Sequence, residues 1–359
     1  MKEFYCNTRV LTGISAEKAL STLGIRRLFM VTDPFFLENG AAQRISKGAL
    51  AQATEIFSRA EPDPTAQLAA EATAAARTFD PDTIVALGGG SAIDLAKAVS
   101  YFYEKPVRLV AIPTTSGSGS EVTDFAILTH NKVKHPLIDK KLCPEIAILD
   151  DSLVKGMPRS LTADTGFDAL AHAAESFVAR GADGFSQALA KDAFRVVYSG
   201  LAASCAGDEE SRSRIHTASC MAGLAFSRSG LGLCHALSHA LGGQFHVPHG
   251  RLNAVLLPHV IQLNSYAMQQ EYACLARAAG ITGSADTIAV RNLISGLEQL
   301  ARQLGIPKDL RAVGIDLAQL RFHKATLVEA VLKDPCCEGN PMKVEPFMVE
   351  KILEAAGRG

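Results

Sequence analysis

The stretch Asp82–Ala98 reads DTIVALGGGSAIDLAKA and joins an apolar run to a helical pattern through three consecutive glycines. A short apolar run that ends at glycine is typical of a buried strand. Ser91, with Asp94 three residues later, is typical of a helix N-cap. Glycines before a helix N-terminus let a phosphate approach free backbone N–H groups. We therefore predict a pyrophosphate-binding turn; because G-x-G-x-x-G is missing, a plain strand-to-helix turn is the alternative.

Strands and helices alternate around this stretch. Three further apolar runs predict buried strands, at Arg27–Thr32, Arg108–Ile112 and Glu145–Leu149. Helical periodicity is present in Gly40–Ala60 and in Ser91–Tyr103. We therefore expect residues 1–158 to form an α/β domain with a mostly parallel sheet and helices on both faces.

Two segments near predicted strand ends favour a dinucleotide. Asp33 follows the strand at 27–32, where its carboxylate could bind an adenosine ribose and repel a 2′-phosphate, which favours NAD over NADP. A turn-forming Asp before Pro34 is the alternative. Pro113–Glu121 (PTTSGSGSE) follows the strand at 108–112, and its alternative is a surface loop. Ligands of open α/β sheets bind at this carboxyl edge, so we expect the cofactor there.

Past about Leu161 the pattern becomes helical, and alanine and leucine dominate. The expected helices are Asp164–Ala179, Gln187–Ala203, Ser211–Ser227, Gly232–Gly242, Asn253–Leu263, Tyr272–Ala279, Asp286–Leu304 and Glu345–Ala356. We place the boundary near Met157–Arg159, so that residues 159–359 form an all-helical domain. This change in composition and predicted secondary structure indicates two separate domains, as the length of 359 residues also suggests.

Half of the 10 histidines lie in the stretch Cys234–His259, CHALSHALGGQFHVPHGRLNAVLLPH. His235 and His239 are four residues apart, as are Asp168 and His172 in TGFDALAHA further upstream. On a helix this spacing places both side chains on one face. A carboxylate and several imidazoles that converge are a ligand set for a divalent transition metal. We therefore predict that residues 159–359 bind a metal; for any one of these histidines, an ordinary core or surface role is the alternative.

The composition excludes several classes of protein. Net charge is −1 and the pI is about 6.8, so there is no electrostatic signal for nucleic acid or an anionic membrane. No apolar run reaches the roughly 20 residues of a membrane span, and the N-terminus is not typical of a signal peptide. The 8 cysteines match no disulfide framework, so we expect reduced thiols and a cytoplasmic protein. For the pair Cys336–Cys337 we expect neither redox activity nor metal binding.

Four segments together resemble the iron-dependent (group III) alcohol dehydrogenase family. They are GGGSAIDLAKA at 88–98, PTTSGSGSEVT at 113–123, TGFDALAHAAES at 165–176 and GLCHALSHALGGQFHVPHG at 232–250. The resemblance covers nearly the whole chain. It implies a dinucleotide-binding domain, a helical domain and a metal between them, that is, the fold shared by dehydroquinate synthase and iron alcohol dehydrogenases.

The resemblance also implies the roles of individual residues. The family's metal ligands fall on Asp168, His172, His235 and His249, and a proposed proton-relay histidine falls on His239, which makes it the candidate catalytic residue. His246 and His259 match no ligand and are expected to be structural. The cofactor contacts fall on Asp33, Gly89, Gly90, Ser91, Asp94, Thr114, Thr115, Ser118 and Lys134. Spacing alone leaves Zn²⁺ open, and the resemblance favours Fe²⁺.

The function implied is hydride transfer between NAD(H) and a small aldehyde or primary alcohol, of the acetaldehyde/ethanol or propanal/1-propanol class. The ending DPCCEGNP resembles short members that serve ethanolamine and propanediol breakdown, which adds a bacterial microcompartment as a second possible location. Family members often dimerise, so we expect a homodimer. One departure is Asp63-Pro64, where many relatives have Asn-Pro. Glycerol-dehydrogenase-like and dehydroquinate-synthase-like zinc enzymes are the alternatives.

Overall fold

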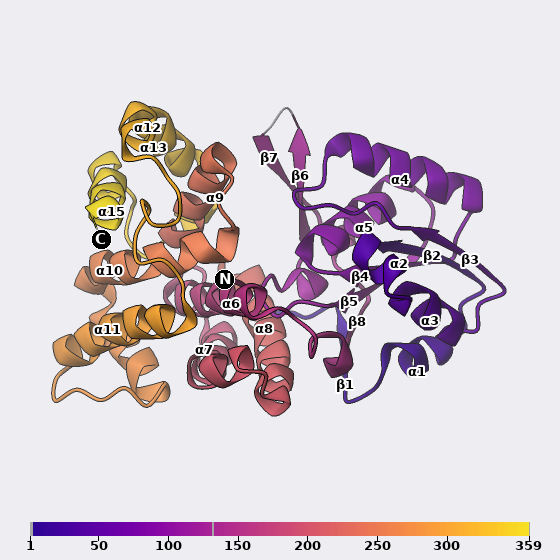
Figure 1. Ribbon diagram of the computed structural model, residues 1–359, viewed down its shortest axis with the longest axis horizontal. Coiled ribbons are helices and arrows are strands. Elements are labelled where there is room, and N and C mark those ends of the chain that lie inside the picture. The colour runs from indigo at the N-terminus through magenta and orange to yellow at the C-terminus, as the bar shows by residue number, and fades with distance from the viewer. Residues whose placement is uncertain (1–2, 131–132, 359) are drawn as a thin grey trace. The chain divides into compact units, whose positions relative to one another are not determined.

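The computed structural model describes residues 3–130 and 133–358 and contains two compact units. One unit spans Tyr5–Gly156; the other contains the chain from Met157 onward together with the described residues before Tyr5. Figure 1 shows a sheet with helices in the first unit and helices throughout the second.

The first unit is built on a six-stranded sheet whose pairings are all parallel. The strand order is β1 (Arg9–Thr12), β8 (Ile146–Leu149), β5 (Arg108–Pro113), β4 (Thr83–Gly88), β2 (Arg27–Thr32) and β3 (Ala53–Phe57). β4, in the centre, is buried at every position, as expected for a strand covered on both faces. The predicted fold class and the four predicted strands are confirmed.

Helices cover both faces of this sheet. Ile84 and Ala86 of β4 belong to a core shared with α4 (Ala66–Phe79) and α5 (Gly90–Phe102). Val85 and Leu87 belong to a second core, shared with α1 (Ala16–Ser21), α2 (Pro34–Glu38) and α3 (Ala41–Gly48). Because successive side chains of a strand point to opposite faces, one apolar run supplies both cores.

The predicted helix over Gly40–Ala60 is wrong in its second half. α3 ends at Gly48, Leu50 has a left-handed backbone (φ 55°), and Ala53–Phe57 forms the edge strand β3. This strand is half-buried with Thr54 exposed, so it lacks the fully apolar run that marks a central strand. The short strand β1 was not predicted either.

A hairpin of β6 (Phe125–His130) and β7 (Val133–Ile138) was also not predicted. Its first strand is fixed to α5 by buried polar side chains. Lys97 Nζ donates to Thr123 Oγ1 at 2.8 Å and to the carbonyl of Phe125 at 2.7 Å, and Asp94 accepts from the backbone N–H of Ile127 at 3.0 Å. Short 3₁₀ turns occur nearby at Ser120–Val122, Lys140–Leu142 and Asp151–Leu153.

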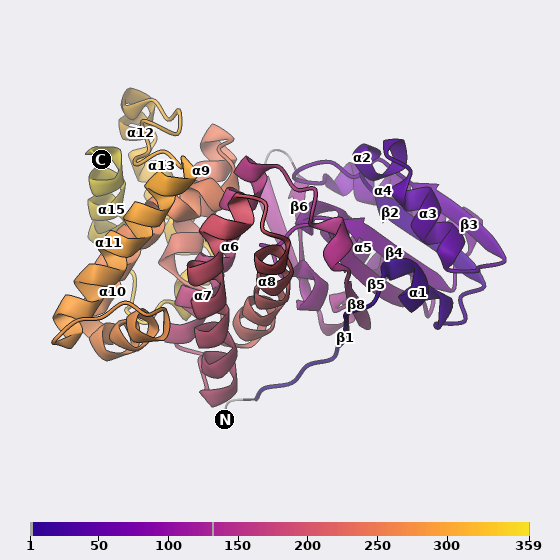
Figure 2. The same cartoon turned by 60° about the horizontal axis from the view of Figure 1, so that its bottom comes forward.

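Helices are the only regular secondary structure among the described residues of the second unit (Figure 2), which confirms the expected all-helical half. Its helices are α6 (Arg159–Val178), α7 (Gly184–Cys205), α8 (Glu209–Ser229), α9 (Leu233–Phe245), α10 (His249–Ala278), α11 (Asp286–Leu304), α12 (Leu317–Phe322), α13 (Lys324–Lys333), α14 (Cys336–Gly339) and α15 (Pro346–Arg358). α10 joins two predicted helices through a kink at Met268. Among the described helices, none is both long and apolar enough to cross a bilayer.

Candidate active site

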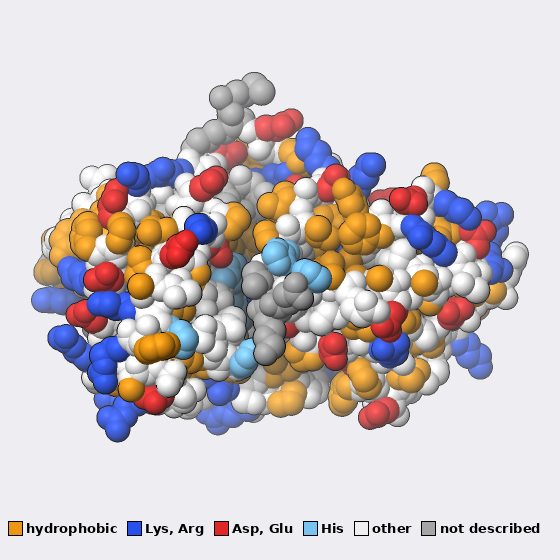
Figure 3. All heavy atoms as spheres, turned by 90° about the horizontal axis from the view of Figure 1, so that it is seen from above, with side chains coloured by type: hydrophobic (Ala, Val, Ile, Leu, Met, Phe, Trp, Pro, Cys, Tyr) orange, Lys and Arg blue, Asp and Glu red, His pale blue; other side chains and the backbone are white. Residues whose placement is uncertain are grey.

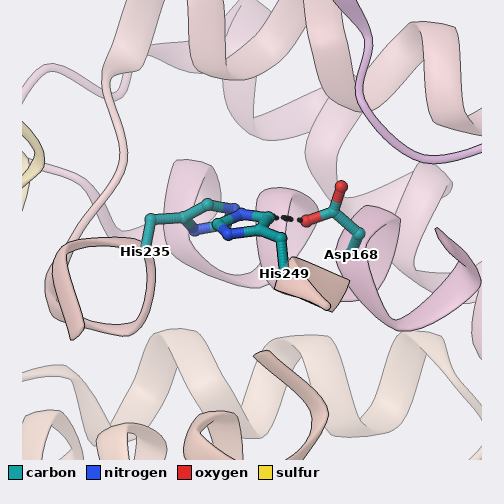
Figure 4. Close-up of side chains that lie close together, drawn as sticks. All are labelled: Asp168, His235 and His249. Carbon is teal, nitrogen blue, oxygen red and sulfur yellow. Dashed lines mark ion pairs between the residues drawn. The ribbon is translucent and has the colours of Figure 1, made fainter. Parts of the chain in front are cut away.

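Three helices of the second unit bring a carboxylate and two imidazoles together. Asp168 lies on α6, His235 in the first turn of α9, and His249 is the first residue of α10. The Nε2 atoms of His235 and His249 lie 3.7 and 3.5 Å from Asp168 Oδ1. Figure 4 shows both rings directed toward this carboxylate. Their ligand atoms lie within 4.8 Å of one another, which is a spacing that one ion can bridge.

His172 lies one helical turn after Asp168 and takes a different position in the cluster. Its ring stacks between Phe226 and His235, at centroid distances of 4.3 and 4.4 Å. The 4.8 Å group contains Asp168, His235 and His249 but not His172. The structure therefore brings three of the four predicted ligands to one point and places the fourth beside them.

Glu175 orients His235. This carboxylate is almost completely buried on α6, seven residues after Asp168 and on the same face. Its oxygens accept the backbone N–H groups of Gly232 and Cys234, at 3.0 and 2.6 Å, and lie 2.7 Å from His235 Nδ1. Glu175 therefore caps the N-terminus of α9. With a metal bound, the same contact would hold the proton of His235 on Nδ1 and leave the Nε2 lone pair for the ion.

Asn253 is a site residue that the sequence analysis missed. It is buried on α10, one turn after His249, and its Nδ2 donates to Asp168 Oδ1 at 2.8 Å. The same Nδ2 lies 3.4 Å from His235 Nε2 and 3.2 Å from His249 Nε2. Its spacing of four residues from His249 could have suggested it, because i,i+4 side chains share a helix face.

The charges in this cluster favour a cation. Burial alone would raise the pKa of Asp168, but the imidazoles of His172, His249 and His235 lower it far below its usual value. Burial likewise opposes a charge on His235, yet its hydrogen bonds with Asp168 and Glu175 raise the pKa of His235 to about 9. Two buried carboxylates thus require positive charge at the point where the imidazole nitrogens meet.

His239 lies one turn after His235 on α9. Its ring stacks on that of His249 at 5.2 Å between centroids, and its Nδ1 lies 2.8 Å from Asp334 Oδ2. The sequence analysis did not identify Asp334. His246 ends α9 in a left-handed conformation, and His259 is half-buried on α10. Neither belongs to the groups of possible metal ligands among the described residues.

In the first unit the glycine turn at 88–90 and the predicted cofactor-binding segment Pro113–Glu121 lie against each other. A Cβ placed on Gly89 would lie 3.2 Å from Thr115 Oγ1, and one on Gly90 would lie 3.0 Å from Ser118 Oγ. Thr114 donates its backbone N–H to the carbonyl of Gly88 at 3.0 Å. β4 and β5 are parallel neighbours, so both segments leave the same edge of the sheet.

The start of α5 differs from the prediction. The helix begins at Gly90, and its N-cap is Gly89, which makes no side-chain cap hydrogen bond. The predicted N-cap role of Ser91 is therefore wrong, and Ser91 lies in the first turn. Gly88 has φ +154°, and a Cβ there would lie 2.6 Å from that of Ala92. Only glycine fits at position 88. The chain enters α5 directly after it, and no side chain caps the first N–H groups of this helix.

The remaining predicted cofactor contacts are at different places. Asp33 caps α2 through the N–H of Phe36 at 3.1 Å, and its Oδ2 lies 3.6 Å from a Cβ placed on Gly88. It therefore has the turn-forming role and is also beside the glycine turn. Asp94 binds β6, as described above. Lys134, on β7, forms an ion pair with Asp63 at 2.6 Å.

The chain belongs to the iron-containing alcohol dehydrogenase family. Residues 8–151 match the model described as "Iron-containing alcohol dehydrogenase", and residues 162–357 match "Fe-containing alcohol dehydrogenase family, C-terminal". It is therefore an oxidoreductase that acts on alcohols or the corresponding aldehydes, as the sequence analysis predicted, and the two zinc-enzyme alternatives are not favoured.

Individual curated relatives support this family assignment. The chain is 35% identical to the 1-propanol dehydrogenase PduQ of Citrobacter freundii, over 99% of both chains. It is 37% identical to an NADPH-dependent butanol dehydrogenase of Clostridium saccharobutylicum, over 83% of this chain and 82% of that one. It is also 34% identical to an aldehyde-alcohol dehydrogenase of Streptococcus pneumoniae. That match covers 93% of this chain but only 43% of the longer relative.

Solved structures share the fold. An iron-containing alcohol dehydrogenase from Thermococcus thioreducens has a TM-score of 0.92 and 31% identity, and the match covers 99% of this chain and 100% of that one. A sulfoacetaldehyde reductase from Bifidobacterium kashiwanohense, in complex with NAD⁺, has a TM-score of 0.90 and 26% identity, covering 99% and 98%.

Proposed function

We propose that this protein uses NADH to reduce a small aldehyde, of the acetaldehyde or propanal class, to its primary alcohol, with Fe²⁺ held by Asp168, His172, His235 and His249. The observation that carries the proposal is the convergence of Asp168 with the Nε2 atoms of His235 and His249. A carboxylate and neutral imidazoles fit a divalent first-row metal. The 1-propanol dehydrogenase relative, similar over its full length, supports the substrate class.

The chain's own residues would supply orientation and proton transfer. When bound, a divalent iron would supply a Lewis acid for the substrate oxygen, and a nicotinamide would supply the hydride. Glu175 keeps Nε2 of His235 directed at the site, and Asn253 holds the carboxylate of Asp168. His239, with Nδ1 bonded to Asp334, has Nε2 available to exchange a proton.

The nucleotide would bind in the first unit, at the turn formed by Gly89, Gly90 and Ser91 with Thr114, Thr115 and Ser118. The first N–H groups of α5 suit a pyrophosphate. Asp33 supports NAD rather than NADP, because its carboxylate beside Gly88 would repel a 2′-phosphate. We assign weaker contacts to Lys134, which is paired with Asp63, and to Asp94, which binds β6.

The proposal extends to organisation and location. Residues 1–158 serve as the dinucleotide-binding domain and residues 159–359 as the metal-binding domain. We propose a homodimer in the cytoplasm, with association with a bacterial microcompartment as the alternative that the ending DPCCEGNP suggests. The partners are small aldehydes and alcohols rather than nucleic acid. Acidic and basic side chains are interspersed on the face shown in Figure 3, which agrees with this view.

The test is an anaerobic assay of NADH oxidation with a panel of aldehydes and added Fe²⁺. We expect activity with acetaldehyde and propanal that is lost after chelation and regained with Fe²⁺. His249→Ala should abolish metal binding while NADH binding, measured by fluorescence, is retained. Full activity in metal-free protein, or activity supported by Zn²⁺ and not by Fe²⁺, would contradict the proposal.

A further inference from the structure

A second group of possible ligands lies beside the first. His239 of α9, Asp334 after the end of α13, and Cys336 at the start of α14 place their ligand atoms within 4.8 Å of one another. All three residues are half-buried. They offer one nitrogen, one oxygen and one sulfur atom, and the set differs from that of the first site by its thiol.

Asp334 is held in place between the other two residues. Its Oδ2 lies 2.8 Å from His239 Nδ1, and its Oδ1 accepts the backbone N–H of Cys336 at 2.8 Å. The neighbouring Cys337 points elsewhere, because its Sγ donates to the carbonyl of Val331 at 2.9 Å. The two adjacent cysteines are therefore not equivalent, and Cys336 is the one in the group.

We propose that His239 Nδ1, Asp334 and Cys336 Sγ form a second metal site, suited to a borderline-soft divalent ion such as Zn²⁺. Zinc bonds are about 2.0–2.2 Å long to N and O and about 2.3 Å to S, which places tetrahedral ligand atoms roughly 3.3–3.7 Å apart. The pair His239–Asp334 must open by about 0.5 Å to reach this spacing. Water can supply the fourth ligand, since the group is half-buried. For Cys336 this replaces our sequence-based expectation of no metal binding.

The protons balance in a simple way. The thiol of Cys336 loses its proton to solvent as the sulfur–metal bond forms, so the ion binds a thiolate and uptake strengthens as the pH rises. The proton on His239 moves from Nδ1 to Nε2 through solvent, and the ring stays neutral. Neutral imidazole with a metal on Nδ1 can no longer accept a proton at Nε2. Zinc at this site would therefore inhibit any reaction in which His239 exchanges a proton.

Cobalt spectroscopy can test the site independently of activity. In an Asp168→Asn background, which removes a ligand of the first site, Co²⁺ bound to Cys336 should give a near-ultraviolet thiolate-to-cobalt charge-transfer band. We expect Cys336→Ser to abolish this band and Cys337→Ser, the matched control, to keep it. Absence of the band in the Asp168→Asn protein, or its survival in Cys336→Ser, would overturn the assignment.

Equilibrium dialysis of the otherwise unaltered protein gives a second measurement. After the first site has been filled with Fe²⁺, the protein should take up one further equivalent of Zn²⁺ with no loss of iron. Cys336→Ser should weaken this uptake at least tenfold, and Cys337→Ser should leave it within twofold. Uptake that displaces iron one for one would contradict the proposal. Neither measurement depends on the aldehyde or on NADH, so failure here is distinguishable from failure of the proposed function.

Discussion

Glu175 links the proposed metal site to the start of α9, and its replacement should reveal that link. Glu175→Gln keeps the shape but lacks one carboxylate oxygen, so the contacts to Gly232, Cys234 and His235 cannot all be kept. Loss of such a supporting hydrogen bond typically reduces metal affinity 10- to 100-fold. We expect a loss of this size in competition with a chelator. Glu354→Gln, on the exposed part of α15, is the control; equal affinities in both variants would exclude the role.

Asp33 should determine the choice between nicotinamide cofactors. Asp33→Asn removes the charge but keeps an oxygen that can accept the N–H of Phe36, so the cap of α2 is retained. A like charge near a 2′-phosphate costs about 1–4 kcal/mol between the limits of bulk water and a protein surface. The ratio of kcat/KM for NADPH to that for NADH should therefore rise at least about fivefold. If the ratio is unchanged, Asp33 serves only as the helix cap.

Sequence spacing was sufficient for some site residues and not for others. Asp168 and His172 stand out because they are four residues apart on one helix. Asn253, Glu175 and Asp334 reach the site through side-chain contacts that span 85, 60 and 95 positions, to Asp168, His235 and His239. Such pairs depend on how helices pack, which no local pattern records. The ligand roles themselves stay predictions until metal binding is measured.

The approach of α10 to α6 depends on one glycine beside His249. A Cβ on Gly250 would lie 2.0 Å from the carbonyl oxygen of Asp164, so Gly250→Ala must push the two helices apart. Overpacking of this kind costs about 1–3 kcal/mol. We expect lower stability toward urea and weaker metal binding, because Asp168 and His249 would separate. Gly243→Ala on α9 is the control: its Cβ would meet nothing within 4 Å, so it should keep or slightly raise stability and leave metal binding unchanged.

Tyr103, at the C-terminal end of α5, should make the free energy of unfolding depend on pH. Burial, with a 2.6 Å hydrogen bond to Asp80, raises the pKa of Tyr103 to about 12 from its usual 10. A raised pKa favours the protonated phenol in the folded state, so this stabilisation is complete below pH 10 and is lost as the pH rises to 12. Tyr103→Phe should lack this part of the decline in urea unfolding. Tyr101→Phe, at an exposed position, should decline like the parent protein.

Among the elements, the central strands were predictable and the edges were not. β2, β4 and β5 are nearly or completely buried, so their sequences are continuous apolar runs. β3 lies at the edge, carries the exposed Thr54, and follows α3 so closely that its residues continued a helical pattern. α10 contains two predicted helices that meet at the kinked residue Met268. The sequence did not predict this, because helix periodicity does not reveal how two segments join.

At the scale of the whole molecule, each unit has its own core, so ligands should stabilise the units separately. At 100 times its Kd, a ligand adds about 2.7 kcal/mol to the unit that binds it. Calorimetry with NAD⁺ should raise a transition of the 5–156 unit by about 5–10 °C, and Fe²⁺ should raise that of the helical unit. Both ligands shifting one common transition equally would show that the units unfold together.

The overall architecture was the most predictable level. The triple glycine after β4 and the change to alanine- and leucine-rich helices after Leu161 were enough to predict an α/β unit followed by a helical one. Gly89 lies against Thr115, and Gly90 lies against Ser118. Both contacts follow because β4 and β5 are parallel neighbours. The strand order itself follows from packing and could not be predicted from the chain.

The hydrogen bonds of Glu175 and Asn253 have a further consequence for how the enzyme matures. They hold His235 and Asp168 in position through protein contacts alone. We therefore expect that the ion can be captured after folding, without serving as a nucleus for assembly. Which metal a newly made chain acquires should then depend on which ions the cell offers at that moment.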